Sequence, residues 1–154
     1  MEIERVSPDA EESQRLVSEL WREVDAIYGN TEPTSNELTG MDAPGAVFLL
    51  AWNFGEAIGC VALRPLSSEI AEVKRMYVQP AARRTGIARR LMEALEASAR
   101  ETGFTEVWLE TGLGQPAAIR LYESLGYERI ASFGEYASDP VSVCYGKKLV
   151  APGA

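Results

Sequence analysis

The stretch Val78-Gln79-Pro80-Ala81-Ala82-Arg83-Arg84-Thr85-Gly86-Ile87-Ala88 predicts the end of a strand, a short turn and the start of a helix. Pro80 ends the strand because proline cannot donate to a sheet ladder. The first amides of a helix lack intrahelical partners and carry partial positive charge, so they can bind a phosphate. Gly86 removes the Cβ that would block the phosphate oxygens, and Ala88 is the next smallest choice. The stretch therefore predicts a phosphorylated cofactor held by main-chain amides.

This turn matches neither of the two best-known phosphate-binding patterns. A P-loop ends in Gly-Lys-Ser/Thr and a Rossmann turn has three glycines, whereas only Gly86 is present here. Six basic residues fall within 74–90, and no acidic residue lies between Glu72 and Glu93. Cations at a helix N-terminus cost about 0.3–1 kcal/mol each, so this crowding indicates that an anion binds there. Three of the bases can add charge-assisted bonds to a phosphate: Arg83, Arg84 and Arg89.

Length and composition restrict the domain number, the cellular location and the metal content that we expect. The 154 residues predict one domain, residues 1–150, with a frayed tail at 151–154. The longest apolar run, 46–52, is too short to cross a bilayer, and the polar start at 1–5 is unlike a secretory signal. We therefore expect a cytoplasmic protein with no membrane partner. With no histidine and two cysteines in the chain, we also expect no metal site and two buried free thiols.

The distribution of charge separates the two halves of the chain. The net charge of −8 argues against nucleic-acid binding. Residues 1–70 carry 13 acidic and 4 basic side chains, whereas residues 71–154 carry 10 acidic and 11 basic side chains. The basic side chains therefore gather in the half of the chain that holds the predicted phosphate site.

Apolar periodicity and turn residues predict a mixed α/β fold. Strands are expected at 3–6, 46–52, 57–66, 70–79, 106–110, 127–133 and 141–149, and helices at 11–28, 85–101 and 115–125. A loop at 29–45 follows the first helix, and Asn53-Phe54-Gly55-Glu56 predicts a hairpin turn. The crossover from 70–79 to 106–110 should be right-handed and parallel, which implies a mixed sheet with helices on both faces.

Three segments together resemble the GNAT superfamily of acetyl-CoA-dependent N-acetyltransferases. They are Arg83-Arg84-Thr85-Gly86-Ile87-Ala88, the preceding strand Glu72–Val78 with Pro80 beyond it, and Ala118–Tyr127 with its Gly-aromatic ending. The resemblance spans roughly residues 46–149. It implies a mostly antiparallel mixed sheet, a splayed central parallel strand pair, and acetyl-CoA as co-substrate.

The resemblance also implies which residues bind the cofactor. The pantetheine arm would lie in the gap beside the strand that precedes the loop, and the backbone N–H of Met76 would polarise the thioester carbonyl. The family often has Asn at the start of the late helix, where this chain has Gln115. The expected cofactor-binding residues are Met76, Tyr77, Val78, Arg83, Arg84, Thr85, Gly86, Ile87, Ala88, Arg89, Gln115 and Ala118.

Two residues match catalytic positions of the family. Tyr122 stands where the family's tyrosine protonates the departing thiolate, although it also suits a core aromatic. Glu72 lies eleven residues before Arg83, an offset similar to that of the general base in the histone-acetylating branch. It could instead pair with Lys74 on the same strand face. Glu110 is the second candidate base, and a water chain is a third route for the proton.

The acceptor side is less determined by the sequence. We expect Trp21, Tyr28, Arg75 and Glu110 to bind the substrate, a primary amine that attacks the thioester directly in a ternary complex. The acidic first half suits a polyamine, an aminoglycoside or a protein lysine, whereas Lys74 and Arg75 suit the carboxylate of an amino acid. A small molecule is favoured because no further domain is predicted to dock a protein. Two alternative functions stay open: acetylation of a protein lysine or N-terminus, and a non-catalytic acyl-CoA sensor or adaptor. The protein could also form a homodimer.

Overall fold

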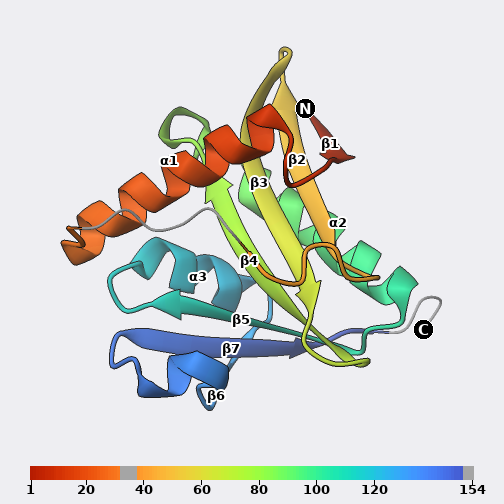
Figure 1. The fold of residues 1–154 in the computed structure, drawn as a ribbon, viewed down its shortest axis with the longest axis vertical. Coiled ribbons are helices and arrows are strands. Elements are labelled where there is room, and N and C mark those ends of the chain that lie inside the picture. The colour runs from red at the N-terminus through yellow and green to blue at the C-terminus, as the bar shows by residue number, and fades with distance from the viewer. Residues whose placement is uncertain (32–37, 151–154) are drawn as a thin grey trace.

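The computed structural model of the chain describes residues 1–31 and 38–150. Within them, seven strands form one sheet in the order β1-β2-β3-β4-β5-β7-β6 (Figure 1). The strands are β1 Glu2–Arg5, β2 Val47–Asn53, β3 Glu56–Pro65, β4 Ile70–Val78, β5 Glu106–Gly112, β6 Glu128–Ile130 and β7 Ser142–Lys148. The helices are α1 Glu11–Tyr28, α2 Ile87–Thr102 and α3 Pro116–Ser124, with short 3₁₀ turns η1 Pro80–Ala82 and η2 Gly134–Ser138.

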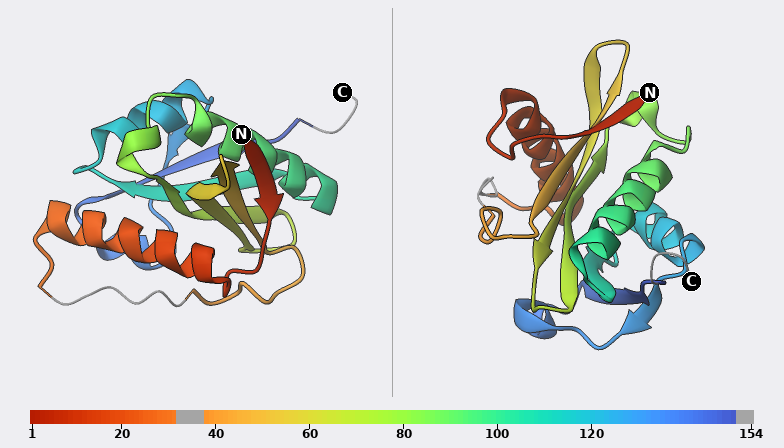
Figure 2. Two further views of the ribbon diagram at one scale, coloured as in Figure 1. Left: turned by 90° about the horizontal axis from the view of Figure 1, so that it is seen from above. Right: turned by 90° about the vertical axis from the view of Figure 1, so that its right-hand side faces the viewer.

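The helices cover both faces of this sheet. Figure 2 shows α1 on one side and α2 and α3 on the other. Leu16, Val17 and Leu20 of α1 pack against one face, and α2 contributes Leu91 and Leu95 to a larger core on the opposite face. Each helix therefore buries one apolar stripe, as the helical spacing in the sequence predicted.

The central strand pair is the exception to an otherwise antiparallel sheet. β4 and β5 pair in parallel, and the other neighbouring strands pair antiparallel. The predicted mixed, mostly antiparallel sheet with helices on both faces is thus confirmed. Part of the predicted 29–45 loop, residues 32–37, and the predicted frayed tail at 151–154 lie outside the described residues.

Two turns follow directly from local chemistry. Phe54 and Gly55, with φ of 51° and 79°, close the β2–β3 hairpin, and two consecutive left-handed residues are the geometry that a two-residue hairpin favours. Gly86, with φ of 84°, precedes α2. The helix begins at Ile87, two residues later than predicted, because the left-handed Gly86 cannot belong to a right-handed helix.

Candidate active site between β4 and β5

The site lies where β4 and β5 separate. Residues 70–73 of β4 pair with residues 106–109 of β5, and the ladder between the two strands then ends. Beyond that point β4 continues along β3 and β5 continues along β7 (Figure 1). A cavity of about 490 Å³ opens in the gap, and we call it the β4–β5 cavity. It is lined by α1 from one face of the sheet and by α3 from the other, so it reaches through the sheet.

A bulge in β4 lies beside this cavity. Lys74 is opposite Ala62 and Tyr77 is opposite Cys60, so two residues of β4 face one residue of β3. The first of the two, Arg75, has φ of 61°, a left-handed conformation that a residue with a side chain rarely adopts. Bulges re-aim backbone and side chains next to active sites. The sequence analysis missed the bulge because no glycine marks it.

Cys60 holds the bulged peptide in place. Its buried thiol donates a hydrogen bond to the carbonyl oxygen of Arg75, with Sγ 3.2 Å from that oxygen. In a trans peptide the C=O and the following N–H point in opposite directions, so fixing this carbonyl also fixes the N–H of Met76. Met76 itself lines the β4–β5 cavity. The residue expected to polarise a thioester carbonyl therefore sits on an anchored peptide unit.

The predicted phosphate turn is open to solvent. A Cβ built on Gly86 would meet no atom within 4 Å, and the first turn of α2 contains no acidic residue. The Thr85 hydroxyl donates to the carbonyl of Ala82, at 2.6 Å, which ties the turn back to η1. The helix dipole and the first amides of α2 therefore face space that an anion can enter.

The arginines of this turn have different surroundings. The Nε of Arg83 donates to the Val78 carbonyl at 2.8 Å, and its guanidinium pairs with Glu23 of α1 at 2.7 Å. Arg89 donates to the hydroxyl of Ser124 at 3.0 Å, while Arg84 is exposed and has a left-handed φ of 66°. Arg83 thus links the turn to α1, and the other two lie at the surface.

Other predicted cofactor residues divide between the two faces. Gln115 and Ala118 of α3 line the β4–β5 cavity, whereas Ile87 is buried in the core beneath α2. Tyr77 turns toward α1, where its hydroxyl donates to Glu19 at 3.3 Å. Burial raises the pKa of Tyr77 to about 12, and the neighbouring carboxylates add to the shift.

Glu110 and Tyr122 line the β4–β5 cavity together. The Ser142 hydroxyl donates to Glu110 at 2.6 Å, and burial raises the pKa of the Glu110 carboxyl above its usual 4.5 despite that bond. Tyr122 is buried, and burial, with a smaller contribution from Glu110, raises the pKa of its hydroxyl. The Glu110 carboxylate therefore accepts a proton more readily than an exposed carboxylate, and the Tyr122 hydroxyl holds its proton more tightly than an exposed tyrosine.

Glu72 lies in a different environment, although it is on the strand next to Glu110. It is 0% exposed and does not line either described cavity. Arg64 pairs with one carboxylate oxygen at 3.0 Å, and the Tyr136 hydroxyl donates to the other at 2.9 Å. Lys74 lies 3.8 Å from the same carboxylate and donates to the Tyr136 oxygen. The pairing of Glu72 with Lys74, considered as an alternative from the sequence, is present within a larger buried cluster.

The predicted acceptor residues of α1 border the same cavity. Trp21 and Tyr28 line it, and the Tyr28 hydroxyl accepts a hydrogen bond from the N–H of Gly114 at 3.2 Å. A Cβ on Gly112 would come within 1.7 Å of that hydroxyl oxygen. Gly112 therefore allows the end of α1 to close against the end of β5, a role that the sequence analysis did not assign.

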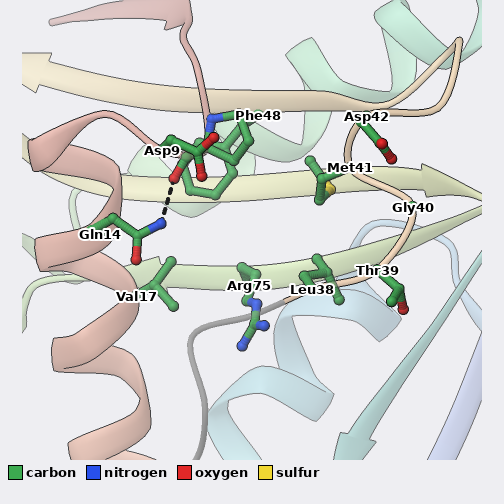
Figure 3. A pocket seen from close by; sticks show the side chains of 11 residues that line it. Asp9, Gln14, Val17, Leu38, Thr39, Gly40, Met41, Asp42, Phe48 and Arg75 are labelled. Atoms are coloured by element: carbon green, nitrogen blue, oxygen red, sulfur yellow. Dashed lines mark hydrogen bonds between the residues drawn. The ribbon is translucent and has the colours of Figure 1, made fainter.

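A second cavity of about 780 Å³ lies beside the first half of α1, and we call it the α1 cavity. Val17 of α1, Phe48 of β2 and Met41 contribute to its lining (Figure 3). Arg75 lines this cavity as well as the β4–β5 cavity. The guanidinium carbon of Arg75 lies 4.8 Å from the centroid of the Trp21 ring.

Sequence reasoning also missed two polar residues at the site. Asp139, before the predicted last strand, lines the β4–β5 cavity, and Ser142 orients Glu110. Both lie far from β4 in sequence, and only the pairing of β7 with β5 brings them close. Among residues 1–31 and 38–150, no group of three or more acidic or cysteine side chains could hold a metal. In the same residues, no helix is long and apolar enough to cross a membrane.

Comparison with known proteins agrees with this geometry. The model of the acetyltransferase (GNAT) family matches residues 12–127. A protein named IAA acetyltransferase, from Azospirillum brasilense, is 36% identical over 148 residues, which cover 96% of this chain and 97% of that relative.

Two solved structures share the fold. A Klebsiella pneumoniae protein assigned as an acyl-CoA N-acyltransferase has a TM-score of 0.83 at 31% identity, covering 97% of each chain. An Elizabethkingia anophelis GNAT acetyltransferase with acetyl-CoA bound has a TM-score of 0.68 at 16% identity, covering 96% of this chain and 97% of its own. At that identity the second likeness shows the fold alone.

Proposed function

The chain belongs to the acetyltransferase (GNAT) family, whose members use acetyl-CoA, and from this premise we propose that it acetylates a primary amine of a small molecule. The observation that carries the proposal is the separation of β4 from β5 over a cavity lined by Glu110 and Tyr122. That gap can hold a thioester arm, and the two side chains supply a base and an acid. The amine would attack the thioester directly in a ternary complex.

The residues around the gap fit acetyl-CoA. The open turn at Gly86 and the first amides of α2 would hold the pyrophosphate. The exposed Arg84 and Arg89 could add charge-assisted bonds, Arg89 by exchanging its contact with Ser124. The stretch of β4 around Met76, which no longer pairs with β5, would bind the pantetheine arm as an added strand on that side. Gln115 and Ala118 would contact the arm from α3.

Electrostatic stabilisation would come from the bulge. The N–H of Met76 would donate to the thioester oxygen as negative charge develops on it, and such donors are often the largest single contribution to catalysis. The contact from Cys60 to the preceding carbonyl holds this peptide before the substrates bind. A donor fixed in advance needs no reorganisation during the reaction.

Glu110 would serve as the general base. It lines the cavity and its pKa is raised by burial, so it can take the proton that an ammonium group must lose before attack. Tyr122 would give its proton to the departing thiolate as the new C–N bond replaces the C–S bond. Glu72 is the first candidate base from the sequence and Glu110 the second, but the enclosure of Glu72 by Arg64 and Tyr136 favours Glu110.

The chain's own side chains support direct transfer. An acyl-enzyme would need an activated nucleophile, but both cysteines are 0% exposed and burial raises the pKa of Cys60 to about 12. A small acceptor is supported by the size of the two cavities and by the name of the Azospirillum relative.

The proposal is tested by measuring CoA release from acetyl-CoA with amino acids, polyamines, aminoglycosides and lysine peptides, with acetylated products identified by mass spectrometry. We expect saturable turnover with one small-molecule class and no covalent acetyl-enzyme. A thermal-shift comparison should show stabilisation by CoA and not by ATP or NAD. Preferred turnover of peptides, or CoA binding with no transfer to any amine, would contradict the proposal.

A further inference from the structure

Arg75 has a position that the proposed mechanism leaves unused. It is the one described residue that lines both the β4–β5 cavity and the α1 cavity. It is 7% exposed, and its guanidinium carbon lies 4.8 Å from the centroid of the Trp21 ring, within the range of a cation–π contact. The wall between the two cavities therefore presents a buried cation that contacts an aromatic ring.

This cation has the chemistry of a carboxylate receptor. A guanidinium offers five N–H donors in a planar fork that matches the two oxygens of a carboxylate, and several partners can share it. The cation–π contact with Trp21 restrains the guanidinium, so less freedom is lost on binding. The indole N–H of Trp21 is itself buried and has no acceptor among residues 1–31 and 38–150. A buried donor of this kind is uncommon, and a ligand oxygen would satisfy it.

The α1 cavity adds a place for an apolar group. Val17 and Phe48 are buried in its wall, and Leu38 and Met41 are half-buried there, whereas its acidic residues Asp9 and Asp42 are exposed. Figure 3 shows Arg75 between Val17 of α1 and Leu38. Apart from Arg75 and the half-buried Gln14, the less exposed part of the lining is thus mostly apolar, which suits an apolar side chain.

We propose, on the basis of the proposed function, that the acceptor is an α-amino acid with a large apolar side chain, whose carboxylate binds Arg75. Its amine would lie in the β4–β5 cavity near Glu110, and its side chain would enter the α1 cavity. An α-amino acid presents these three groups from a single carbon, and Arg75 stands at the wall that the two cavities share. A polyamine or an aminoglycoside would instead bring further positive charge against the Arg75 guanidinium.

The chemical step stays balanced with this acceptor. The α-nitrogen forms a bond to the acetyl carbon while the C–S bond breaks. The ammonium group first loses one proton to Glu110, which later releases it to solvent. As the C–S bond breaks, the thiolate takes the proton of Tyr122, and the second proton lost from the nitrogen restores the tyrosine hydroxyl. The product is an N-acetylamino acid.

The test compares acceptors that differ only in the carboxylate, using the full-length protein and acetyl-CoA. The matched set is leucine, leucinamide and 3-methylbutylamine, with glycine as the control for the side chain. We expect kcat/KM to fall by about 10- to 100-fold when the carboxylate is removed, the range of a charge-assisted hydrogen bond to a buried group. Glycine should also be a poorer acceptor than leucine. Leucinamide is informative because its amine loses a proton more readily than that of leucine, so basicity alone would favour it.

Variants of Arg75 and Trp21 test whether these two side chains cause the preference for a carboxylate. Arg75→Asn keeps a residue that tolerates the left-handed conformation and removes the guanidinium, so the preference for leucine over 3-methylbutylamine should disappear while CoA affinity is unchanged. Trp21→Phe keeps an aromatic ring beside Arg75 and removes the indole N–H, and should reduce the preference less. If Arg75→Asn does not fold, the acceptor comparison on the unchanged protein decides alone. Equal or faster turnover of 3-methylbutylamine would overturn the carboxylate assignment and leave the acetyltransferase proposal standing, whereas no transfer to any amine would overturn both.

Discussion

The paired and the splayed halves of β4 and β5 place two glutamates in opposite situations. In the paired half, Glu72 is fully buried and both of its oxygens are taken by Arg64 and Tyr136. In the splayed half, Glu110 lines the cavity and a single hydroxyl, from Ser142, donates to it. The residue type is the same and the strands are neighbours. What differs is whether the strands remain hydrogen-bonded at that point, and this decides which carboxylate a substrate can reach.

We expect the largest effect from a substitution in the splayed half, where Glu110 is the proposed base. Glu110→Gln removes the proposed base and should lower kcat by roughly 10²- to 10⁴-fold, the range for one acid–base group. The measurement is steady-state turnover with the best acceptor, together with CoA affinity by calorimetry. Asp139→Asn is the matched control, because Asp139 lines the same cavity and loses the same charge. A Glu110→Gln protein within ten-fold of the unchanged chain would return the role of base to Glu72.

A substitution in the paired half should change the stability of the fold rather than the turnover. Glu72→Gln leaves Arg64 and Lys74 without their carboxylate and should lower the free energy of unfolding by about 3–5 kcal/mol, as breaking a buried ion pair does. The measurement is urea unfolding, with the exposed Glu69→Gln as a control expected to change it by less than about 0.5 kcal/mol. Turnover of the folded protein should remain within about ten-fold. Normal stability with lost turnover would reverse the contrast between the two glutamates.

Tyr122 offers the next largest effect. Tyr122→Phe removes the proton donor to the thiolate and should lower turnover by roughly 10²-fold. Tyr127→Phe is the control, because its ring lies 5.9 Å from that of Tyr122 and its hydroxyl donates to Glu96 at 2.9 Å. That variant should lose stability and keep its turnover. Unchanged turnover of Tyr122→Phe with normal folding would leave Tyr122 as a packing residue alone.

The smallest expected effect is on the pH dependence of stability. The folded protein holds the Glu110 proton more tightly than the unfolded chain, because burial raises the pKa of the folded carboxyl above 4.5. Its contribution to stability is therefore full below the unfolded pKa and is lost as the pH rises through the folded pKa. Glu110→Gln should then raise Tm by a few degrees at most at pH 7.5, and this gain should shrink toward pH 4. A gain that grows as the pH falls would contradict the direction of the pKa shift.

Much of the fold could be predicted because its signals are local. The helices at 11–28 and 85–101, the hairpin at Phe54-Gly55 and the turn at Gly86 follow from side-chain spacing and glycine placement, and the structure contains all of them. The parallel pair followed from the crossover rule and from the family resemblance.

The site was harder to predict because it depends on where strands stop pairing. Nothing in the residues of β4 indicates that its ladder with β5 ends at Val73. The bulge at Arg75 is equally hidden, since an arginine is an unusual residue for a left-handed conformation. The spacing between Glu72 and Arg83 reports only separation along the chain, from β4 to the turn beyond η1. The access of Glu110 to substrate depends instead on its position relative to β4, β7 and α1.

The enclosure of the two cysteines has a practical consequence. Both are 0% exposed, and the thiol of Cys60 faces a backbone carbonyl with its pKa raised to about 12. Cys60 therefore carries almost no thiolate at physiological pH and Cys144 is enclosed by the fold, so alkylating reagents and mild peroxide find no ready target on the folded chain. Such reagents should therefore label the protein only when it opens, which makes the rate of cysteine labelling a direct measure of local unfolding around the sheet.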